Sequence, residues 1–170
     1  VQDRERGVEL VQPQVIAGPH APRDRPRGRV ARRAQPRFRL GQSRDGVPVR
    51  SLLADLVTFI GPECSRKGVS LSLGARGGPE TLSADPFQLK HAVLNLVLNA
   101  LQATPAGGVI AIETAGDAET LEVRVRDTGE GMTGRVLPRV FEAFFTTREG
   151  GTGLGLPIAQ RIVESHGGKL

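Results

Sequence analysis

The sequence predicts an α/β (α+β) domain in which helices and a sheet form separate packed layers. Two observations lead to this prediction: apolar residues recur at helical spacing in some segments, and they alternate with polar residues, as in strands, in others. A strand of this kind buries one face and a helix buries one stripe, so each layer needs the other to complete a core. At 170 residues, the chain is long enough for one domain with an arm.

The first part of the chain differs in composition from the rest. Residues 1–50 hold 12 arginines against 5 acidic residues, whereas residues 51–170 hold 11 basic and 13 acidic residues. Five prolines within residues 1–36 break any long helix, and little apolar surface is present to offset the entropy of ordering. We therefore expect residues 1–45 to be a disordered arm and residues 46–170 to be the folded domain.

The bulk composition also limits the class of protein. No stretch approaches the length needed to cross a bilayer, and the N-terminus has no signal-peptide pattern. The single Cys64 rules out an intramolecular disulfide framework, so a cytoplasmic location is expected. An arginine-rich arm with Phe38 as its one aromatic residue is weak evidence for nucleic-acid binding, and nucleic acid is not an expected partner.

The first two elements of the domain follow from periodicity and turn residues. Apolar residues at helical spacing after Pro48 predict a helix that ends at Gly61-Pro62. Residues 69–73 alternate like a half-buried strand, and residues 74–79 form a turn region. The residues that carry the helical spacing are Leu52, Leu53, Leu56, Val57 and Ile60.

The second helix begins at Asp85-Pro86-Phe87-Gln88. Asp85 can cap it, proline suits the first helical position, and Gln88 can reach back as in a capping box. The helix runs to about Ala103, and the stretch from Pro105 to Gly108 ends it. One of its faces is an unusual polar stripe on an otherwise apolar helix, and it indicates a ligand face more than an ordinary solvent face. The stripe consists of Gln88, His91, Asn95, Asn99 and Gln102.

Two strands and a last helix complete the predicted elements. Residues 109–114 and 121–127 are expected to be strands, and the second has the alternation of a sheet with one face on a core. The last helix is expected from about Pro157 to His166. Leu170 resembles the first residue of a further strand, so we expect a fragment that lacks its C-terminal strands.

Asp127-Thr128-Gly129-Glu130-Gly131-Met132 directly follows a predicted strand. An ionised aspartate only accepts hydrogen bonds, so it suits an adenine amino group and opposes a guanine carbonyl. A simple Asp-x-Gly turn is the competing interpretation of this segment taken alone. The glycines also match a dinucleotide-binding spacing, but Pro138 interrupts the helix that such a site needs.

A glycine-rich loop runs from Glu149 to Pro157 and leads into the last helix. Glycines let successive backbone N–H groups turn toward an anion, and the helix N-terminus adds a favourable dipole. The loop therefore predicts a triphosphate site, although it is not a P-loop because no Gly-Lys-Ser/Thr follows. A flexible linker is the alternative, but linkers seldom carry residues such as Leu154 and Leu156 between glycines.

Three of the six phenylalanines lie between these loops, in the segment Phe141–Arg148. They could anchor a mobile lid whose threonines and arginine face phosphate. For Phe141 and Phe144, packing in the core is an equally good interpretation.

The order Asn-x-x-x-Asn-Ala, Asp-x-Gly-x-Gly, Phe-x-x-Phe-Phe, Gly-x-Gly-x-Gly resembles the ATP-binding catalytic domain of sensor histidine kinases, within the superfamily shared with DNA gyrase and MutL. It is most similar to the nitrogen-regulation and PAS-linked kinases. The match covers roughly residues 48–170. The resemblance implies the Bergerat ATP-binding fold, a two-layer sandwich with helices on one face of a mixed sheet.

The resemblance also implies roles for individual residues. Asn99 would ligate Mg²⁺ through its amide oxygen, and Asn95, the catalytic residue, would contact phosphate or water nearby. Asp127 would bind the adenine amino group of ATP, with Gly129 and Gly131 letting the base approach. The other implied nucleotide contacts are Met132, Phe144, Phe145, Thr146, Thr147, Arg148, Gly151, Thr152, Gly153, Leu154, Gly155 and Leu156.

Three positions decide which chemistry the resemblance supports. The gyrase-like ATPases carry a glutamate base where Asn95 stands, and an amide cannot take a proton from water, so phosphoryl transfer is favoured over hydrolysis. Arg148 stands where the family often has lysine, which keeps the cation and changes its geometry. Gln102 stands where many members carry a basic residue, which removes one phosphate contact.

The implied partners are a histidine-bearing dimerisation domain, a response regulator downstream, and a second copy in a full-length homodimer. None of His20, His91 and His166 resembles the family's phosphoacceptor. Residues 1–45 are then either a remnant of the dimerisation region or aberrant. Two alternatives remain: a nucleotide-dependent interaction module (a pseudokinase or an anti-sigma-factor-type serine kinase), and a nucleic-acid binder that uses the basic arm.

Overall fold

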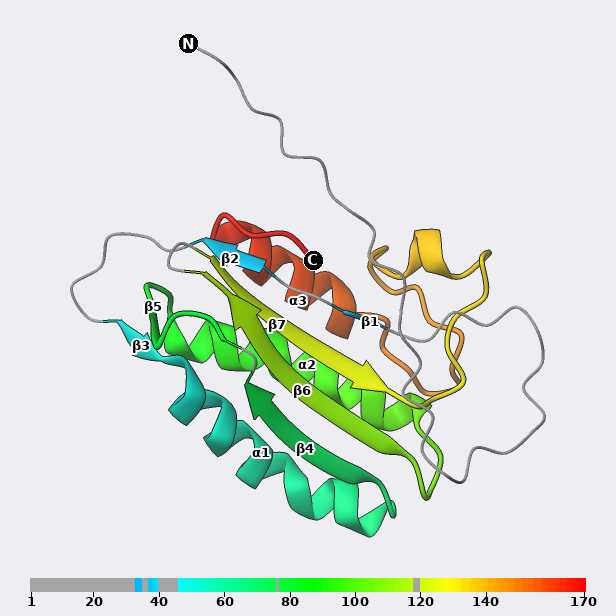
Figure 1. Cartoon of the computed structure of the whole chain (residues 1–170). Helices are drawn as coiled ribbons and strands as arrows, with labels where there is room; N and C mark the ends of the chain where they lie inside the picture. Colours follow the sequence, from blue (N-terminus) through cyan, green and yellow to red (C-terminus); the bar gives the residue numbers. More distant parts are fainter. Residues whose placement is uncertain (1–32, 35–36, 40–45, 76, 118–119) are drawn as a thin grey trace.

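The computed structural model describes residues 33–34, 37–39, 46–75, 77–117 and 120–170. Its helices pack against a mixed sheet, as Figure 1 shows. In chain order the elements are β1 (Arg33–Ala34), β2 (Arg37–Arg39), β3 (Val47–Pro48), α1 (Val49–Arg66), β4 (Ser70–Ala75), β5 (Thr81–Leu82), α2 (Pro86–Ala103), β6 (Val109–Gly116), β7 (Thr120–Asp127), a 3₁₀ turn (Leu137–Arg139) and α3 (Gly155–Ser165).

The main sheet has the order β1-β7-β6-β4, with β2 also paired to β7. Strands β4 and β6 are parallel, whereas β6 and β7 form an antiparallel pair in which Ile110 lies opposite Asp127. Strands β3 and β5 form a separate two-stranded sheet. The predicted mixed sheet with a helical layer is therefore confirmed.

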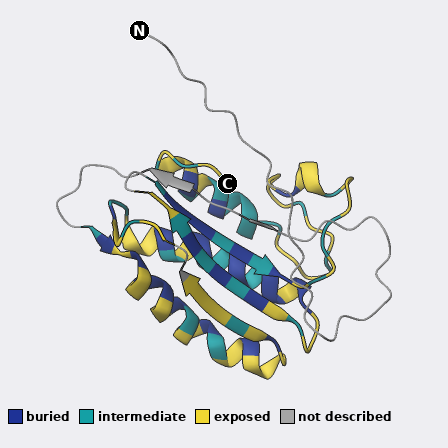
Figure 2. Cartoon of the chain, viewed as in Figure 1, coloured by how far each residue is buried: buried dark blue, intermediate teal, exposed yellow. Residues whose placement is uncertain are grey.

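The core lies between the sheet and the helices, and α2 is its centre. Buried residues concentrate on β6, β7 and α2, whereas much of β4 and the outer side of α1 are exposed (Figure 2). On β7, Leu121 and Val123 are almost fully buried, which is the inward face that the alternation predicts. Burying these apolar faces is the main driving force for the fold.

The start of α2 forms as the sequence predicts. Asp85 Oδ1 accepts hydrogen bonds from the N–H groups of Phe87 (2.8 Å) and Gln88 (3.1 Å). The bond from the Gln88 N–H is the main cause that holds the pKa of Asp85 below its usual value. Gln88 reaches back to the Asp85 carboxylate (3.1 Å), and the Asp85 N–H instead donates to Nε2 of His166 (3.2 Å), just beyond the end of α3.

The predicted end of the first helix is wrong. Helix α1 continues through Gly61-Pro62 to Arg66. Pro62 removes one intrahelical hydrogen bond, but Ile60 and Cys64 on either side of it are buried in the core and keep the helix in place. Strand β4 likewise extends through residues 74 and 75, which were expected to form a turn.

Disorder was expected for the whole of residues 1–45, and this is wrong for residues 33–34 and 37–39. These residues form β1 and β2, which pair antiparallel with β7. The physical reason is that an outer strand presents unpaired N–H and C=O groups, which a neighbouring segment can satisfy. The remainder of that expectation lies outside the described residues.

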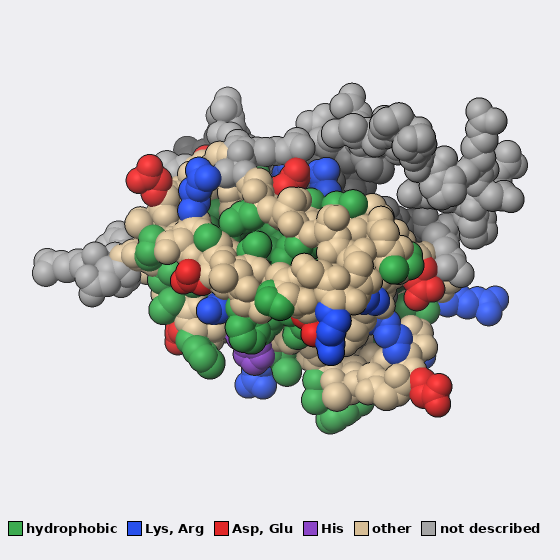
Figure 3. Space-filling view, turned by 90° about the horizontal axis from the view of Figure 1, so that it is seen from below, with side chains coloured by type: hydrophobic (Ala, Val, Ile, Leu, Met, Phe, Trp, Pro, Cys, Tyr) green, Lys and Arg blue, Asp and Glu red, His purple; other side chains and the backbone are tan. Residues whose placement is uncertain are grey.

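The surface shows both signs of charge. On the face seen in Figure 3, basic and acidic side chains are interspersed among apolar and other side chains, so this face carries no extended field of one sign. Across the part of the chain that the structure describes, no helix combines the length and the apolar character that a membrane span requires.

We expect Lys67→Met to lower the free energy of unfolding by about 1 kcal/mol. Lys67 Nζ donates to the backbone oxygens of Leu101 (2.6 Å) and Gln102 (3.2 Å), so it satisfies carbonyl groups at the C-terminal end of α2 and complements the helix dipole there. Urea unfolding measures the change. Lys169→Met, at an exposed lysine near the C-terminal end of the chain, is the matched control and should be neutral.

Candidate functional site

A cavity of about 460 Å³ opens between α2, α3 and the long connection that joins β7 to α3. Its walls come from the C-terminal half of α2, from residues 132–140, from the segment Phe141–Arg148 (the Phe segment), from residues 149–155 (the glycine loop) and from the first turn of α3. The lining residues are Asn95, Leu98, Asn99, Gln102, Met132, Val136, Val140, Phe145, Thr146, Thr147, Arg148, Gly150, Gly151, Thr152, Gly153, Leu154, Gly155, Leu156, Pro157 and Ile158.

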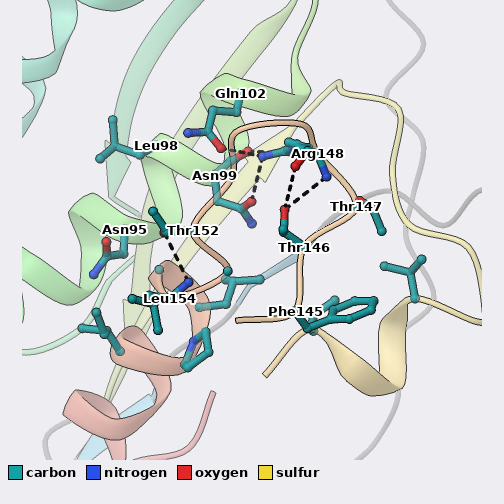
Figure 4. A pocket seen from close by; sticks show the side chains of 18 of the residues that line it. Asn95, Leu98, Asn99, Gln102, Phe145, Thr146, Thr147, Arg148, Thr152 and Leu154 are labelled. Carbon is teal, nitrogen blue, oxygen red and sulfur yellow. Dashed lines mark hydrogen bonds between the residues drawn. The ribbon is translucent and has the colours of Figure 1, made fainter. Parts of the chain in front are cut away.

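The α2 wall is polar. Of the predicted stripe, Asn95, Asn99 and Gln102 line the cavity (Figure 4), whereas Gln88 caps the helix and His91 is exposed elsewhere. The Nδ2 atom of Asn95 is buried and has no hydrogen-bond partner in the described part of the chain. A buried donor without a partner costs free energy, which marks Asn95 as a candidate for contact with a ligand.

Arg148 is the single charged residue among the described residues that line the cavity. Its Nη1 donates to Oε1 of Gln102 (2.6 Å) and to Oδ1 of Asn99 (3.3 Å), and its Nη2 lies 3.5 Å from the Asn99 backbone oxygen. Figure 4 shows the guanidinium lying against these two side chains of α2. The cavity therefore carries one positive charge and no carboxylate among its described lining residues.

The start of α3 adds a second source of positive potential. Leu154, its capping residue, makes no side-chain cap within the described chain, and Gly155 and Leu156 of the first turn line the cavity. First-turn N–H groups have no partner within a helix, and the helix dipole favours anions at this end. Asn95 lies beside this turn, since a Cβ atom on Gly155 would come within 3.6 Å of Asn95 Oδ1.

The glycine loop packs closely under the Phe segment. The Phe144 N–H donates to the Gly153 oxygen (3.1 Å), and Gly153 has a φ of +66°. A Cβ atom there would lie 2.7 Å from the Phe145 nitrogen and 2.8 Å from the Phe144 Cα. At Gly151, a Cβ atom would lie 2.5 Å from Thr146 Oγ1. These glycines are therefore required by the approach of the protein's own backbone as well as by any ligand.

Asp127 sits at the end of β7, buried to 9% exposure, and its Oδ1 accepts the Gly129 N–H at 2.9 Å. The turn interpretation of this segment is therefore observed. Of the predicted nucleotide contacts, the structure leaves Asp127, Gly129, Gly131 and Phe144 outside the cavity lining and brings the others together. Met132, five residues after Asp127, lines the cavity. Base binding by Asp127 stays a prediction.

The Phe segment lines the cavity through one of its phenylalanines. Phe145 lines the cavity and lies under the Arg139 guanidinium, 4.2 Å from ring centroid to cation. Phe141 is 37% exposed and Phe144 is 75% exposed, with a φ of +65°, so packing in the core is wrong for both.

The apolar part of the lining was not predicted from the sequence. Leu98 follows Asn95 by one turn of α2, and this spacing could have predicted it. Val136 and Val140 are four residues apart and line the cavity together, but Pro138 between them hid the helical spacing. Pro157 and Ile158, in the first turn of α3, extend the lining two residues beyond Leu156, the last of the predicted nucleotide contacts.

Comparison with protein families and curated proteins gives a consistent result. A family model described as histidine kinase-, DNA gyrase B-, and HSP90-like ATPase matches residues 84–170. The sensor histidine kinase ZraS of Klebsiella oxytoca is 36% identical over 126 residues, which cover 73% of this chain and 27% of ZraS. Sporulation kinase C of Bacillus subtilis is 42% identical over 89 residues, which cover 52% of this chain and 21% of that kinase.

Solved structures show the same similarity. The nucleotide-free catalytic domain of histidine kinase ThkA superposes with a TM-score of 0.66 at 25% identity, over 72% of this chain and 80% of that domain. Full-length ShkA in complex with AMPPNP gives a TM-score of 0.64 at 29% identity, over 72% of this chain and 26% of ShkA.

The chain spans about a quarter of the length of these curated kinases. The family match contains α2 with its two asparagines, the Asp127 loop, the glycine loop and α3. Taken with the superposed catalytic domain, it shows that the chain belongs to the histidine kinase-, DNA gyrase B-, and HSP90-like ATPase family, and that its relatives are sensor histidine kinases.

Proposed function

We propose that this chain is the ATP-binding catalytic module of a two-component sensor histidine kinase. It transfers the γ-phosphoryl group of ATP to a histidine on a dimerisation domain. The observation that carries the proposal is the meeting of the Asn95 and Asn99 amides with the glycine loop and the uncapped start of α3 around one cavity. That arrangement offers donors and positive potential to a polyphosphate.

The residues present fit a magnesium nucleotide. The buried Nδ2 of Asn95 has no partner among the described residues, and a phosphate oxygen or a bound water would supply one. Asn99 would hold Mg²⁺ through its amide oxygen, and the remaining ligands would be phosphate and water oxygens, which the ion prefers. When bound, the metal neutralises charge on the phosphates.

The chain's own residues then bind and position the phosphates. Arg148 and the first turn of α3 attract the negative charge, while Phe145, Val136 and Val140 form an apolar wall that limits water. Asn95 cannot act as a general base, because an amide does not accept a proton near neutral pH. The γ-phosphoryl group is therefore kept for a stronger nucleophile such as an imidazole.

The partners follow from this role. The phosphoryl group passes to a histidine-bearing dimerisation domain and then to a response regulator, with the full-length protein acting as a homodimer in the cytoplasm. The names of relatives such as the sensor histidine kinase ZraS and sporulation kinase C support the kinase activity in this proposal.

A transfer assay tests the proposal. The chain is incubated with γ-labelled ATP, Mg²⁺ and a separately supplied histidine-bearing dimerisation domain. We expect label on the added domain that is labile in acid and stable in base, and Asn99→Ala should slow its appearance at least about tenfold. Acid-stable label would assign the chain to the serine kinases, and saturable nucleotide binding without any transfer would indicate a pseudokinase.

A further inference from the structure

We infer that Gln102 is a positioning residue that holds the Arg148 guanidinium at the nucleotide cavity. The inference rests on the proposed function. The shortest hydrogen bond of the guanidinium runs from Nη1 to Gln102 Oε1 at 2.6 Å, against 3.3 Å to Asn99 Oδ1. Gln102 is thus the principal side-chain acceptor of the one described charge that lines the cavity.

Both ends of Arg148 are tied to the cavity walls. Its backbone N–H donates to Thr146 Oγ1 (3.1 Å), and its backbone oxygen accepts the Gly151 N–H (3.2 Å), which fixes the main chain between the Phe segment and the glycine loop. The guanidinium reaches across to α2, so the side chain bridges the loop and the helix (Figure 4). The backbone of Gln102 is itself held in place, because Lys67 Nζ donates a hydrogen bond to its oxygen at 3.2 Å.

The chemistry of position 102 fits this task. A neutral amide oxygen holds the guanidinium and leaves its full positive charge for phosphate. An acidic residue there would neutralise that charge, and a basic residue would repel Arg148. The arginine, with several donors in a planar fork, can keep one bond to Gln102 while another N–H group meets an anion.

Gln102 matters because Asn99, the other side-chain acceptor of the Arg148 guanidinium, is also the residue that we assign to Mg²⁺. Arg148 bonds the same Asn99 oxygen that we assign to Mg²⁺, so guanidinium and metal compete for one acceptor. Entry of a metal nucleotide would displace the guanidinium from Asn99, and the bond to Gln102 would keep it within reach of the phosphates. Without Gln102, the released side chain would extend into solvent.

A double-mutant cycle tests the inference. Binding of a fluorescent ATP analogue with Mg²⁺ is measured for the unaltered chain, Gln102→Met, Arg148→Met and the double variant. We expect Gln102→Met to weaken binding about fivefold when Arg148 is present, the order of one partly exposed charge-assisted hydrogen bond, and less than about 1.5-fold in the Arg148→Met background. Gln102 is exposed, so its variant should keep the fold, which thermal unfolding checks.

The controls separate positioning from a structural role. Arg161→Met, at an exposed arginine of α3 outside the cavity lining, should leave binding unchanged. Equal losses of binding affinity from Gln102→Met in both backgrounds would show that Gln102 acts through helix α2 and not through Arg148. That result would overturn this inference and leave the proposed function in place. If the unaltered chain showed no saturable binding, the proposed function itself would fail, and the inference with it.

Discussion

Replacing Asp127 with asparagine should weaken the binding of adenine nucleotides by about tenfold to a hundredfold, the range of one hydrogen bond to a charged group. The carboxylate is largely buried at the end of β7, where a hydrogen bond is poorly screened. Asparagine keeps the size and an oxygen for the Gly129 N–H, so the turn and the fold should survive. Competitive titration with ADP and GDP measures the affinity, and circular dichroism checks the fold.

The base preference gives this prediction its specificity. A carboxylate only accepts hydrogen bonds and disfavours the guanine carbonyl, whereas the amide can donate to it. The preference for ADP over GDP should therefore narrow in the variant. Glu130→Gln makes the same chemical change at an exposed neighbour and should alter neither affinity. Unchanged adenine affinity in Asp127→Asn would leave Asp127 with only its turn role.

Gly153→Ala should destabilise the domain by about 2–4 kcal/mol and disturb nucleotide binding at the same time. The residue has a φ of +66°, and the added methyl group would press on the Phe144–Phe145 backbone. Relief requires the Phe segment to lift from the glycine loop, which removes Phe145, Thr146 and Arg148 from the cavity wall. Urea unfolding and nucleotide titration of the same samples measure the two effects.

Gly150→Ala is the matched control. Gly150 also has a positive φ, +72°, but a Cβ atom there meets nothing within 4 Å. In this variant the free energy of unfolding should fall only by the cost of the backbone conformation, about 1 kcal/mol. Equal losses of stability in the two variants would mean that backbone conformation alone, and not contact with the Phe segment, makes glycine necessary at position 153.

Local signals in the sequence were sufficient for most of the fold. The Asp85-Pro86 start of α2 and the alternation of β7 predicted elements that the structure contains. Prediction failed where tertiary packing overrides local chemistry. Pro62 would end an isolated helix, but burial of Ile60 and Cys64 holds α1 together beyond it. Strands β1 and β2 depend on the outer edge of β7, which no local pattern in residues 33–39 reveals.

The candidate site shows the same division. Spacing four apart placed Asn95 and Asn99 on one face, and glycine content identified the loop beside them. The bond between Arg148 and Gln102 joins residues 46 positions apart, and the sequence showed only that each departs from a common pattern. The positive φ of Phe144 could not be predicted either, because phenylalanine rarely adopts the left-handed backbone conformation.

His166 links the two helices that form one side of the cavity, α2 and α3. Its Nε2 accepts the Asp85 N–H and its Nδ1 lies 2.8 Å from the Ile162 oxygen, so the end of α3 is fastened to the beginning of α2. The cavity lies at the opposite ends of these two helices, near Gln102 and Gly155. The hydrogen bond between Asp85 and His166 holds the two helices together at the end away from the cavity. We therefore expect adaptation to different ligands in the connection between β7 and α3, which hydrogen exchange can follow residue by residue.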